Sequence, residues 1–297
     1  MDIAAKAAAI QPELVSLRRY FHQHPEPSME EVNTGNYIAE QLRQLGIAVE
    51  RKAKTGLVGT LVGKKDGPVV ALRADIDALP IKEETGLPFA SVNAGFMHAC
   101  GHDAHTTCLL GAAKILSQIQ NEIPGTIKFF FQPGEEQAMG AKLLVEEGVL
   151  DNVDAAFGMH VDWTAPVGTV SVDPGPRMAS ADMLTIRVEG KGGHGSAPHQ
   201  GVDAAVVAAA IIMNLQTIIS REIDPLESAV ITIGKLVTGD RFNILPARAY
   251  MEGTCRCFNP AVRENLPVSI SRIAENTAAA FRATAKLQYE FACPPTI

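Results

Sequence analysis

The sequence predicts an α/β protein of two domains, the first with a mostly parallel central sheet and the second of the α+β class. The chain has 297 residues, which is more than a single hydrophobic core usually fills. Up to residue 161, short apolar runs alternate with helical periodicity, as in strands joined by crossover helices. After Pro174, Gly175 and Pro176 the order becomes strand-helix-strand-strand-helix-strand, which is typical of a split βαβ unit.

The first domain is expected to open with two helices. Residues 1–24 lack a long apolar run and predict an amphipathic helix, which argues against a signal peptide. Ser28 followed by Glu31 is a capping-box pattern, which predicts a second helix that ends near Leu45, before Gly46. Helical periodicity also predicts helices at 106–120 and 138–147. Strands are expected at 58–62, 69–72, 126–132 and 155–161, the last two of them buried.

The second domain is expected to contain two helices on one antiparallel sheet. The segment 203–220 is the most apolar of the chain, but Asn214 and Gln216 interrupt it, so it predicts a core helix and no membrane span. A second helix is expected at 260–284. The predicted strands are 184–189, 229–236, 249–258 and 287–291.

Charge and cysteine content limit the classes of partner and compartment. The chain has 26 basic and 33 acidic residues, for a net charge of −7, which argues against nucleic acid or an anionic membrane surface as its partner. Five cysteines in a chain without a signal segment predict a cytoplasmic protein whose thiols are free or bind metal.

Two segments concentrate residues suited to metal chemistry. Cys100 and His102 lie in a stretch that offers a thiolate and several imidazoles, although a buried loop or a nucleophilic cysteine fits that stretch equally well. Glu135 and Glu136 follow the strand at 126–132, and active sites of open α/β sheets gather at such strand ends. One carboxylate can bind a metal while the other acts as general base; the alternative is a solvated acidic turn.

Three other positions carry weaker signals. His160 stands at the end of an apolar strand, where a histidine is either a ligand or, more commonly, a packed side chain. Asp75 or Asp77 can orient an imidazole, or can lie in an acidic loop or cap a helix. His194 lies in a glycine-rich loop, from which it can donate to an oxyanion or face solvent.

Taken together, these segments resemble the M20 metallopeptidase family and its amidohydrolase branch, which contains aminoacylases, hippurate hydrolases and hydrolases of auxin–amino-acid conjugates. The resemblance covers essentially the whole chain in the order of the family. It implies that the protein cleaves the amide bond of a small N-acyl amino acid. It also implies a catalytic domain, 1–175, and a lid domain, 176–290, through which the chain forms a homodimer. Residues 291–297 would begin the return to the catalytic domain. The matching segments are 22–26, 71–81, 97–105, 129–136, 158–161, 190–199 and 242–246.

The resemblance also implies roles for single residues. Glu135 matches the general base that activates water, and Asp77 matches an orienting aspartate. His194 matches a lid histidine that reaches the partner's active site in related dimers, and Asn243 matches a residue that contacts substrate. Manganese is the metal expected first, with zinc or cobalt as alternatives. Four residues match ligands of two divalent metal ions: Cys100, His102, Glu136 and His160.

The chain departs from the family's pattern near its end. The family uses a further histidine ligand from the C-terminal part of the catalytic domain, whereas the last histidine here is His199 and the sequence stops at Ile297. We therefore expect one metal to bind weakly and the first domain to expose apolar surface and an unpaired sheet edge. The competing hypotheses are an inactive remnant that only binds or dimerises, and a hydrolase with Cys100 as nucleophile and His102 or His105 as base.

Overall fold

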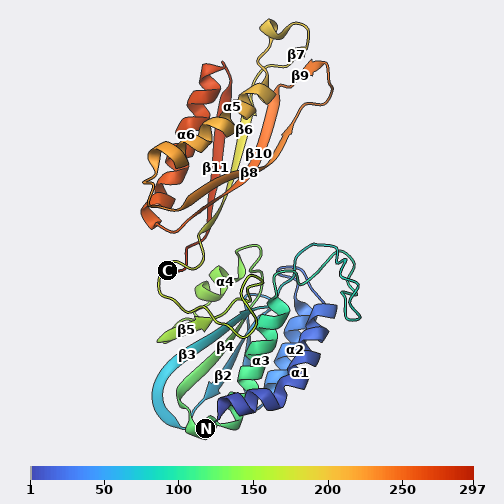
Figure 1. Ribbon diagram of the computed structural model, residues 1–297, viewed down its shortest axis with the longest axis vertical. Coiled ribbons are helices and arrows are strands. Elements are labelled where there is room, and N and C mark those ends of the chain that lie inside the picture. Colours follow the sequence, from blue (N-terminus) through green and yellow to red (C-terminus); the bar gives the residue numbers. More distant parts are fainter. Residues whose placement is uncertain (1) are drawn as a thin grey trace. The chain divides into compact units, whose positions relative to one another are not determined.

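The computed structural model describes residues 2–297, whose contacts divide the chain into two compact units, Met1–Val170 and Ser171–Ile297 (Figure 1). Buried apolar side chains form separate clusters in the two units, so each unit has a hydrophobic core of its own. The roles of catalytic domain and lid that the resemblance gives to the two parts of the chain stay predictions.

The first unit is built on a five-stranded sheet with the order β1-β2-β4-β3-β5. β3 pairs in parallel with both β4 and β5, while β1 and β4 each pair antiparallel with β2. Within this sheet β2 therefore runs against the other four strands, which confirms the predicted mostly parallel sheet. The strands are β1 (Ala48–Lys52), β2 (Gly56–Val62), β3 (Lys65–Asp75), β4 (Pro124–Gln132) and β5 (Ala155–Gly158).

The helices of the first unit cover both faces of this sheet. Because side chains alternate along a strand, Phe129 and Phe131 of β4 point to one face and Phe130 to the other. The first two pack into the core beneath α1, α2 and α3, whereas Phe130 packs with Leu144 of α4. Figure 1 shows these helices on the two sides of the sheet. The helices are α1 (Ile3–Gln23), α2 (Val32–Gln44), α3 (His102–Gln118) and α4 (Gly140–Glu146), and a 3₁₀ turn, Gln120–Glu122, follows α3.

The predicted capping box at the start of α2 is wrong. The Ser28 hydroxyl donates to Asp77 Oδ2 at 2.6 Å instead of capping the helix. The buried Glu31 carboxylate accepts from Thr55 Oγ1 at 2.5 Å and from the Gly134 amide at 2.8 Å, and α2 begins only at Val32. Partners from the sheet and its loops have replaced the local bonds that the sequence pattern suggested.

The expectation of a buried strand at 155–161 is also wrong. β5 ends at Gly158, all four of its residues are exposed, and the Phe157 side chain keeps 62% of its accessible surface. The physical reason is its place in the sheet: β5 is an edge strand that pairs with β3 on one side. An apolar run therefore does not ensure burial here, and the sheet shows the exposed apolar edge that the sequence led us to expect.

The second unit has the predicted split βαβ order around a four-stranded antiparallel sheet, β11-β6-β10-β8. A small second sheet pairs β7 (Gly193–His194) with β9 (Ile244–Leu245), and a 3₁₀ turn, Pro198–Gln200, follows β7. The main elements are β6 (Ala181–Glu189), α5 (Ala204–Thr217), β8 (Ala229–Thr238), β10 (Arg248–Cys257), α6 (Pro260–Ala280) and β11 (Thr284–Cys293).

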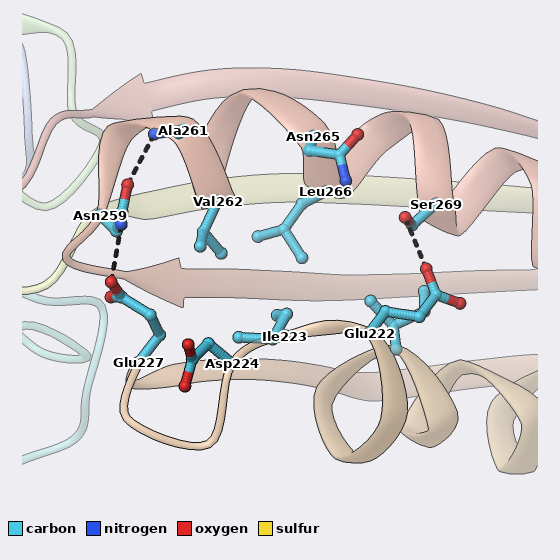
Figure 2. A pocket seen from close by; sticks show the side chains of 11 residues that line it. Glu222, Ile223, Asp224, Glu227, Asn259, Ala261, Val262, Asn265, Leu266 and Ser269 are labelled. Carbon is cyan, nitrogen blue, oxygen red and sulfur yellow. Dashed lines mark hydrogen bonds between the residues drawn. The ribbon is translucent and has the colours of Figure 1, made fainter.

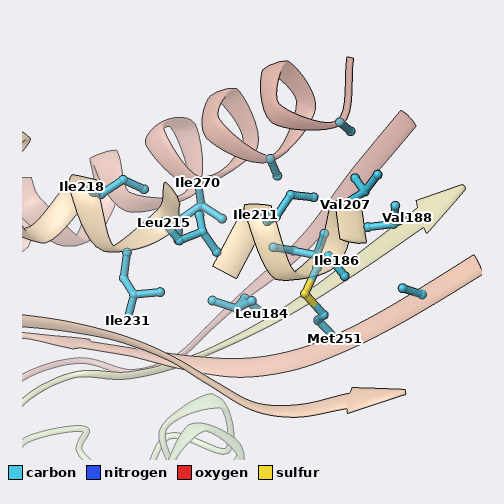
Figure 3. Packing of buried hydrophobic residues seen from close by; sticks show 14 of the residues in the cluster. Leu184, Ile186, Val188, Val207, Ile211, Leu215, Ile218, Ile231, Met251 and Ile270 are labelled. Carbon is cyan, nitrogen blue, oxygen red and sulfur yellow. The ribbon is translucent and has the colours of Figure 1, made fainter. Parts of the chain in front are cut away.

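Helices α5 and α6 pack on one face of this sheet (Figure 3). Ile211 and Leu215 of α5 meet Leu184 and Ile186 of β6, and all four side chains are almost completely buried. Together with the π-helical turn that follows α5, the segment Ala204–Glu222 is long and apolar enough to cross a membrane. By length and composition the expectation that Asn214 and Gln216 rule out a span is therefore wrong, although the face that carries Ile211 and Leu215 packs in the core.

Replacement of Ile211 by alanine tests this packing. The change removes a fully buried side chain, so we expect the free energy of unfolding to fall by about 2–5 kcal/mol. Met213 lies on the same helix and is 70% exposed, so Met213→Ala should change stability by no more than about 0.5 kcal/mol. Urea denaturation followed by circular dichroism measures both, and equal losses would contradict the assigned core.

Candidate metal centre

Parallel strands bring most of the candidate residues of the first unit to one edge of its sheet. Asp75 ends β3 and Asp77 follows it, Glu135 and Glu136 follow β4, and His160 follows β5. Because β3, β4 and β5 run in the same direction, their carboxyl ends lie along the same edge, where open α/β sheets form their sites. Helix α3 begins at the same place and adds Cys100 and His102.

The side chains of these loops form two groups that share His102. In the first group, Cys100 Sγ lies 3.4 Å from His160 Nε2. In the second, His102 Nε2 lies 3.7 Å from Glu135 Oε2 and 3.8 Å from Glu136 Oε1. Within each group the possible ligand atoms all lie within 4.8 Å of one another, so the structure brings together the residues that the resemblance selected.

A glycine makes the close approach of these loops possible. Gly101 separates Cys100 from His102 and has a φ of +86°, a left-handed conformation that side chains disfavour. A Cβ atom at this position would lie 2.3 Å from Val161 Cγ2. The turn that carries two candidate ligands therefore packs directly against the residue that follows a third, His160.

Asp77 fixes the orientation of the His102 ring. His102 Nδ1 lies 2.9 Å from the Asp77 carbonyl oxygen and 3.1 Å from its Oδ1. A carbonyl oxygen only accepts, so Nδ1 carries a proton, and the lone pair of the neutral ring is on Nε2. His102 Nε2 and Glu136 Oε1 are both buried without a hydrogen-bond partner, which is costly for polar atoms. This unpaired nitrogen and oxygen, beside a thiolate and a second imidazole, fit a divalent cation.

The surroundings of the site favour the thiolate form of Cys100 but the protonated forms of His102 and Glu136, from which a bound cation would displace the protons. Burial lowers the pKa of His102, but the hydrogen bond to Asp77, the nearby Cys100 thiol and the surrounding carboxylates outweigh burial and raise it to about 11. The neighbouring His102 and His160 rings hold the pKa of the Cys100 thiol below its usual value, which favours the thiolate. Burial, opposed by His102, raises the pKa of Glu136.

A third cluster of possible ligands, Asp75 with His102 and His105, differs because Asp75 and His105 are already hydrogen-bonded. Asp75 Oδ1 accepts from His105 Nδ1 at 2.6 Å, and Asp75 Oδ2 accepts from Arg73 Nη1 at 2.7 Å. His105 Nε2 accepts from the Val161 amide at 2.9 Å. Since both ring nitrogens of His105 are engaged, it is not available as a base for Cys100.

Two of the predicted site residues lie in the second unit. His194 and Asn243 come from the paired strands β7 and β9, where the Gly195 amide donates to the Asn243 carbonyl oxygen at 2.9 Å. His194 Nδ1 accepts from the Ser196 hydroxyl at 2.7 Å and from the Ser196 amide at 3.1 Å. Its Nε2 therefore carries the proton and is the donor of this exposed ring.

The second unit also contains a cavity of about 300 Å³ between the segment after α5 and the start of α6 (Figure 2). All three of its acidic side chains have partners: Glu222 accepts from Ser269 at 3.0 Å, Asp224 from the Leu226 amide at 2.9 Å, and Glu227 from Asn259 at 2.8 Å. None of the site residues expected from the sequence lines this cavity, so it is separate from the candidate metal centre.

Known proteins match both the sequence and the structure. Residues 71–295 match the model of peptidase family M20/M25/M40. The chain is 43% identical over 289 residues to an N-acetyl-L-cysteine deacetylase from Bacillus subtilis (strain 168), covering 97% of this chain and 70% of that protein. It is 41% identical over 290 residues to an N-acyl-L-amino acid amidohydrolase from Geobacillus stearothermophilus, with 97% and 78% covered.

A solved structure agrees with these sequence matches. The crystal structure of a dinuclear metal-binding peptidase of the M20 family from Bacillus subtilis superposes with a TM-score of 0.81 at 41% identity. The match covers 97% of this chain and 76% of that one, so the likeness extends through both units.

A histidine titration in the presence of a chelator tests the charges assigned to the site. His102 should keep its proton up to about pH 11, whereas burial holds the pKa of His98 near 4. The raised pKa of His102 stabilises the fold below pH 6.5, and this contribution is lost as the pH rises through 11. The lowered pKa of His98 stabilises the fold above pH 6.5, and this contribution is lost as the pH falls towards 4.

Nuclear magnetic resonance of ¹⁵N-labelled histidine separates the two rings. Assignments come from the variants His98→Asn and His102→Asn, each of which removes one titrating signal. Midpoints near 6.5 for both rings would contradict the environments described above.

Proposed function

Since the chain belongs to peptidase family M20/M25/M40, we propose that it hydrolyses the amide bond of small N-acyl amino acids at a centre of two divalent metal ions. As a member of this family it is a metal-dependent amide hydrolase. The N-acyl amino acid as substrate is our proposal, and the names of two relatives support it: an N-acetyl-L-cysteine deacetylase and an N-acyl-L-amino acid amidohydrolase.

The proposal rests on one observation, the unpaired and buried His102 Nε2 and Glu136 Oε1, 3.8 Å apart. A bound divalent cation would satisfy both atoms, polarise the amide carbonyl and make water a stronger acid. We propose manganese first, as the resemblance implies, with zinc or cobalt as alternatives. Imidazole and carboxylate suit all three metals, and a thiolate favours zinc. The proposed ligands are Cys100, His102, Glu136 and His160.

The two adjacent glutamates have different surroundings, which supports different roles. The Glu136 side chain is 19% exposed and carries the unpaired oxygen, as suits a ligand. The Glu135 side chain is 37% exposed, and its Oε2 lies 3.7 Å from His102 Nε2, so it reaches both solvent and the proposed ligands. We propose that Glu135 takes a proton from the attacking water and later passes it to the leaving amine.

Asp77 is the proposed orienting aspartate. It is fully buried, and its carboxylate lies against His102 Nδ1 while accepting from Ser28 and from the Glu136 amide at 3.0 Å. These bonds hold a ligand ring and the backbone of a second ligand in a fixed relation. Such supports commonly change metal affinity by about 10–100-fold when they are removed.

For the second unit we propose the roles that the resemblance implies. His194 Nε2–H would donate to the oxyanion that develops during attack, and Ser196 holds the ring in the tautomer that can do so. Asn243 would contact substrate, and residues 176–290 would form a homodimer. Analytical ultracentrifugation of the purified chain tests the dimer, and a sedimentation coefficient that stays monomeric at all concentrations would contradict it.

Turnover of acylated amino acids tests the proposed reaction. We expect the chain, supplied with Mn²⁺, Co²⁺ or Zn²⁺, to release the amino acid from N-acetyl amino acids or hippurate, and a chelator to stop it. Glu135→Gln should lower kcat by about 10²–10⁴-fold, because it removes the base. Its metal affinity, measured by calorimetry, should be unchanged.

The alternatives predict other results. A chain that binds metal and dimerises without turnover would favour the inactive binding protein. Activity that persists in chelator but is lost on alkylation would favour Cys100 as nucleophile.

A further inference from the structure

We propose that His105 is a positioning residue that fastens the backbone next to His160 and so holds this ring beside Cys100. The inference rests on the proposed function, because it concerns the loop of one proposed ligand. His105 has both ring nitrogens engaged, and the proposed reaction gives it no other part.

The loop that carries His160 has little other support. It follows β5, an exposed edge strand of four residues, and residues 159–172 contain no helix or strand. His160 is exposed, and its Nδ1 donates to the carbonyl oxygen of the next residue, Val161, at 2.7 Å. The direction of the ring, and with it the 3.4 Å contact from Nε2 to Cys100 Sγ, therefore follows the backbone at Val161.

His105 holds that backbone from a rigid element. The Val161 amide donates to His105 Nε2 at 2.9 Å, and the His105 and His160 rings meet edge to face with centroids 4.6 Å apart. His105 is 1% exposed and lies in the first turn of the 17-residue helix α3. His102 begins the same helix, so two positions three residues apart carry a proposed ligand and the anchor of another on one helical face.

A carboxylate and a guanidinium set the tautomer that this anchor needs. Asp75 Oδ1 accepts from His105 Nδ1 at 2.6 Å, so the proton lies on Nδ1 and the lone pair of Nε2 is left to accept from Val161. Arg73 donates to the other oxygen of Asp75 at 2.7 Å and to Gln132 Oε1 at 2.8 Å. The anchor is therefore tied to the ends of β3 and β4, the strands that lead to the other proposed site residues.

Val161 also contacts the turn between the first two proposed ligands. Its Cγ2 occupies the space in which a Cβ on Gly101 would lie, only 2.3 Å away. A shift of Val161 would therefore move His160 away from Cys100 and loosen the packing against the Cys100–His102 turn. This geometry distinguishes His105 from a histidine that merely fills the core.

Two similar variants separate positioning from general packing. His105→Asn keeps a donor for Asp75 but loses the acceptor for the Val161 amide. His105→Gln places an amide oxygen close to the former Nε2 and keeps that acceptor. We expect His105→Asn to weaken Co²⁺ or Zn²⁺ binding by about 10–100-fold in calorimetry and His105→Gln to stay much closer to the unaltered chain.

Amide hydrogen exchange at Val161 gives a second readout that needs no activity. Exchange should become faster in His105→Asn and stay slow in His105→Gln. Thr107→Val is the matched control, since it removes a buried hydrogen bond on the same helix, from Thr107 Oγ1 to Asp103 O at 2.7 Å, and leaves the anchor intact. It should alter neither metal affinity nor exchange at Val161. Circular dichroism checks that each variant is folded.

Equal metal affinities for His105→Asn and His105→Gln, or unchanged exchange at Val161 in His105→Asn, would overturn the proposal. Failure of the proposed function has a different signature, because the unaltered chain would then bind no cation. The exchange comparison still decides in that case whether His105 anchors Val161.

Discussion

The hydrogen bond between His102 Nδ1 and the carbonyl oxygen of Asp77, 2.9 Å long, is the contact on which the rest of the site depends. It fixes the ring, holds a proton on Nδ1 and directs Nε2 towards Glu135 and Glu136. That nitrogen is buried and unpaired, and so is Glu136 Oε1. Folding leaves such atoms without partners at a cost, which is offset where a cation binds.

The fold supports this contact from several directions. Asp77 follows the end of β3, and His102 is the first residue of α3. Glu136 lies in the loop after β4, and its amide donates to Asp77 Oδ2 at 3.0 Å. The N-terminal region adds the Ser28 hydroxyl to the same carboxylate. A second set of hydrogen bonds runs from Asp75 to the His105 ring and from there to the Val161 amide, next to His160. Pairs of aspartate and histidine thus support both sides of the proposed centre.

The sequence predicted the features that depend on local pattern. The mostly parallel first sheet and the split βαβ unit followed from apolar periodicity, and the grouping of Cys100, His102, Glu136 and His160 followed from the resemblance to a known family. Burial of β5 was wrong, because an edge strand and a central strand can have the same apolar run. β1 was missed, since its sequence, AVERK, is mostly polar and pairs on one side of β2.

The residues that support the site were harder to foresee because their partners are distant along the chain. Ser28 and Glu31 matched a helix cap, yet they bind Asp77, Thr55 and Gly134. His105 was considered only as an alternative base for Cys100, and the signal of its positioning role was the spacing of three from His102 on a helix. Hydrogen-bond partners 24 to 103 residues apart leave no local sequence pattern that would predict them.

X-ray absorption spectroscopy of the chain loaded with Zn²⁺ tests the central claim most directly. If Cys100 joins imidazole and carboxylate around the cation, the spectrum should contain one sulfur scatterer at about 2.3 Å together with nitrogen or oxygen at about 2.0–2.2 Å. Substitution of Cys100 by serine should remove the sulfur contribution. A spectrum of the unaltered chain with oxygen neighbours alone, or one that Cys100→Ser leaves unchanged, would contradict the account.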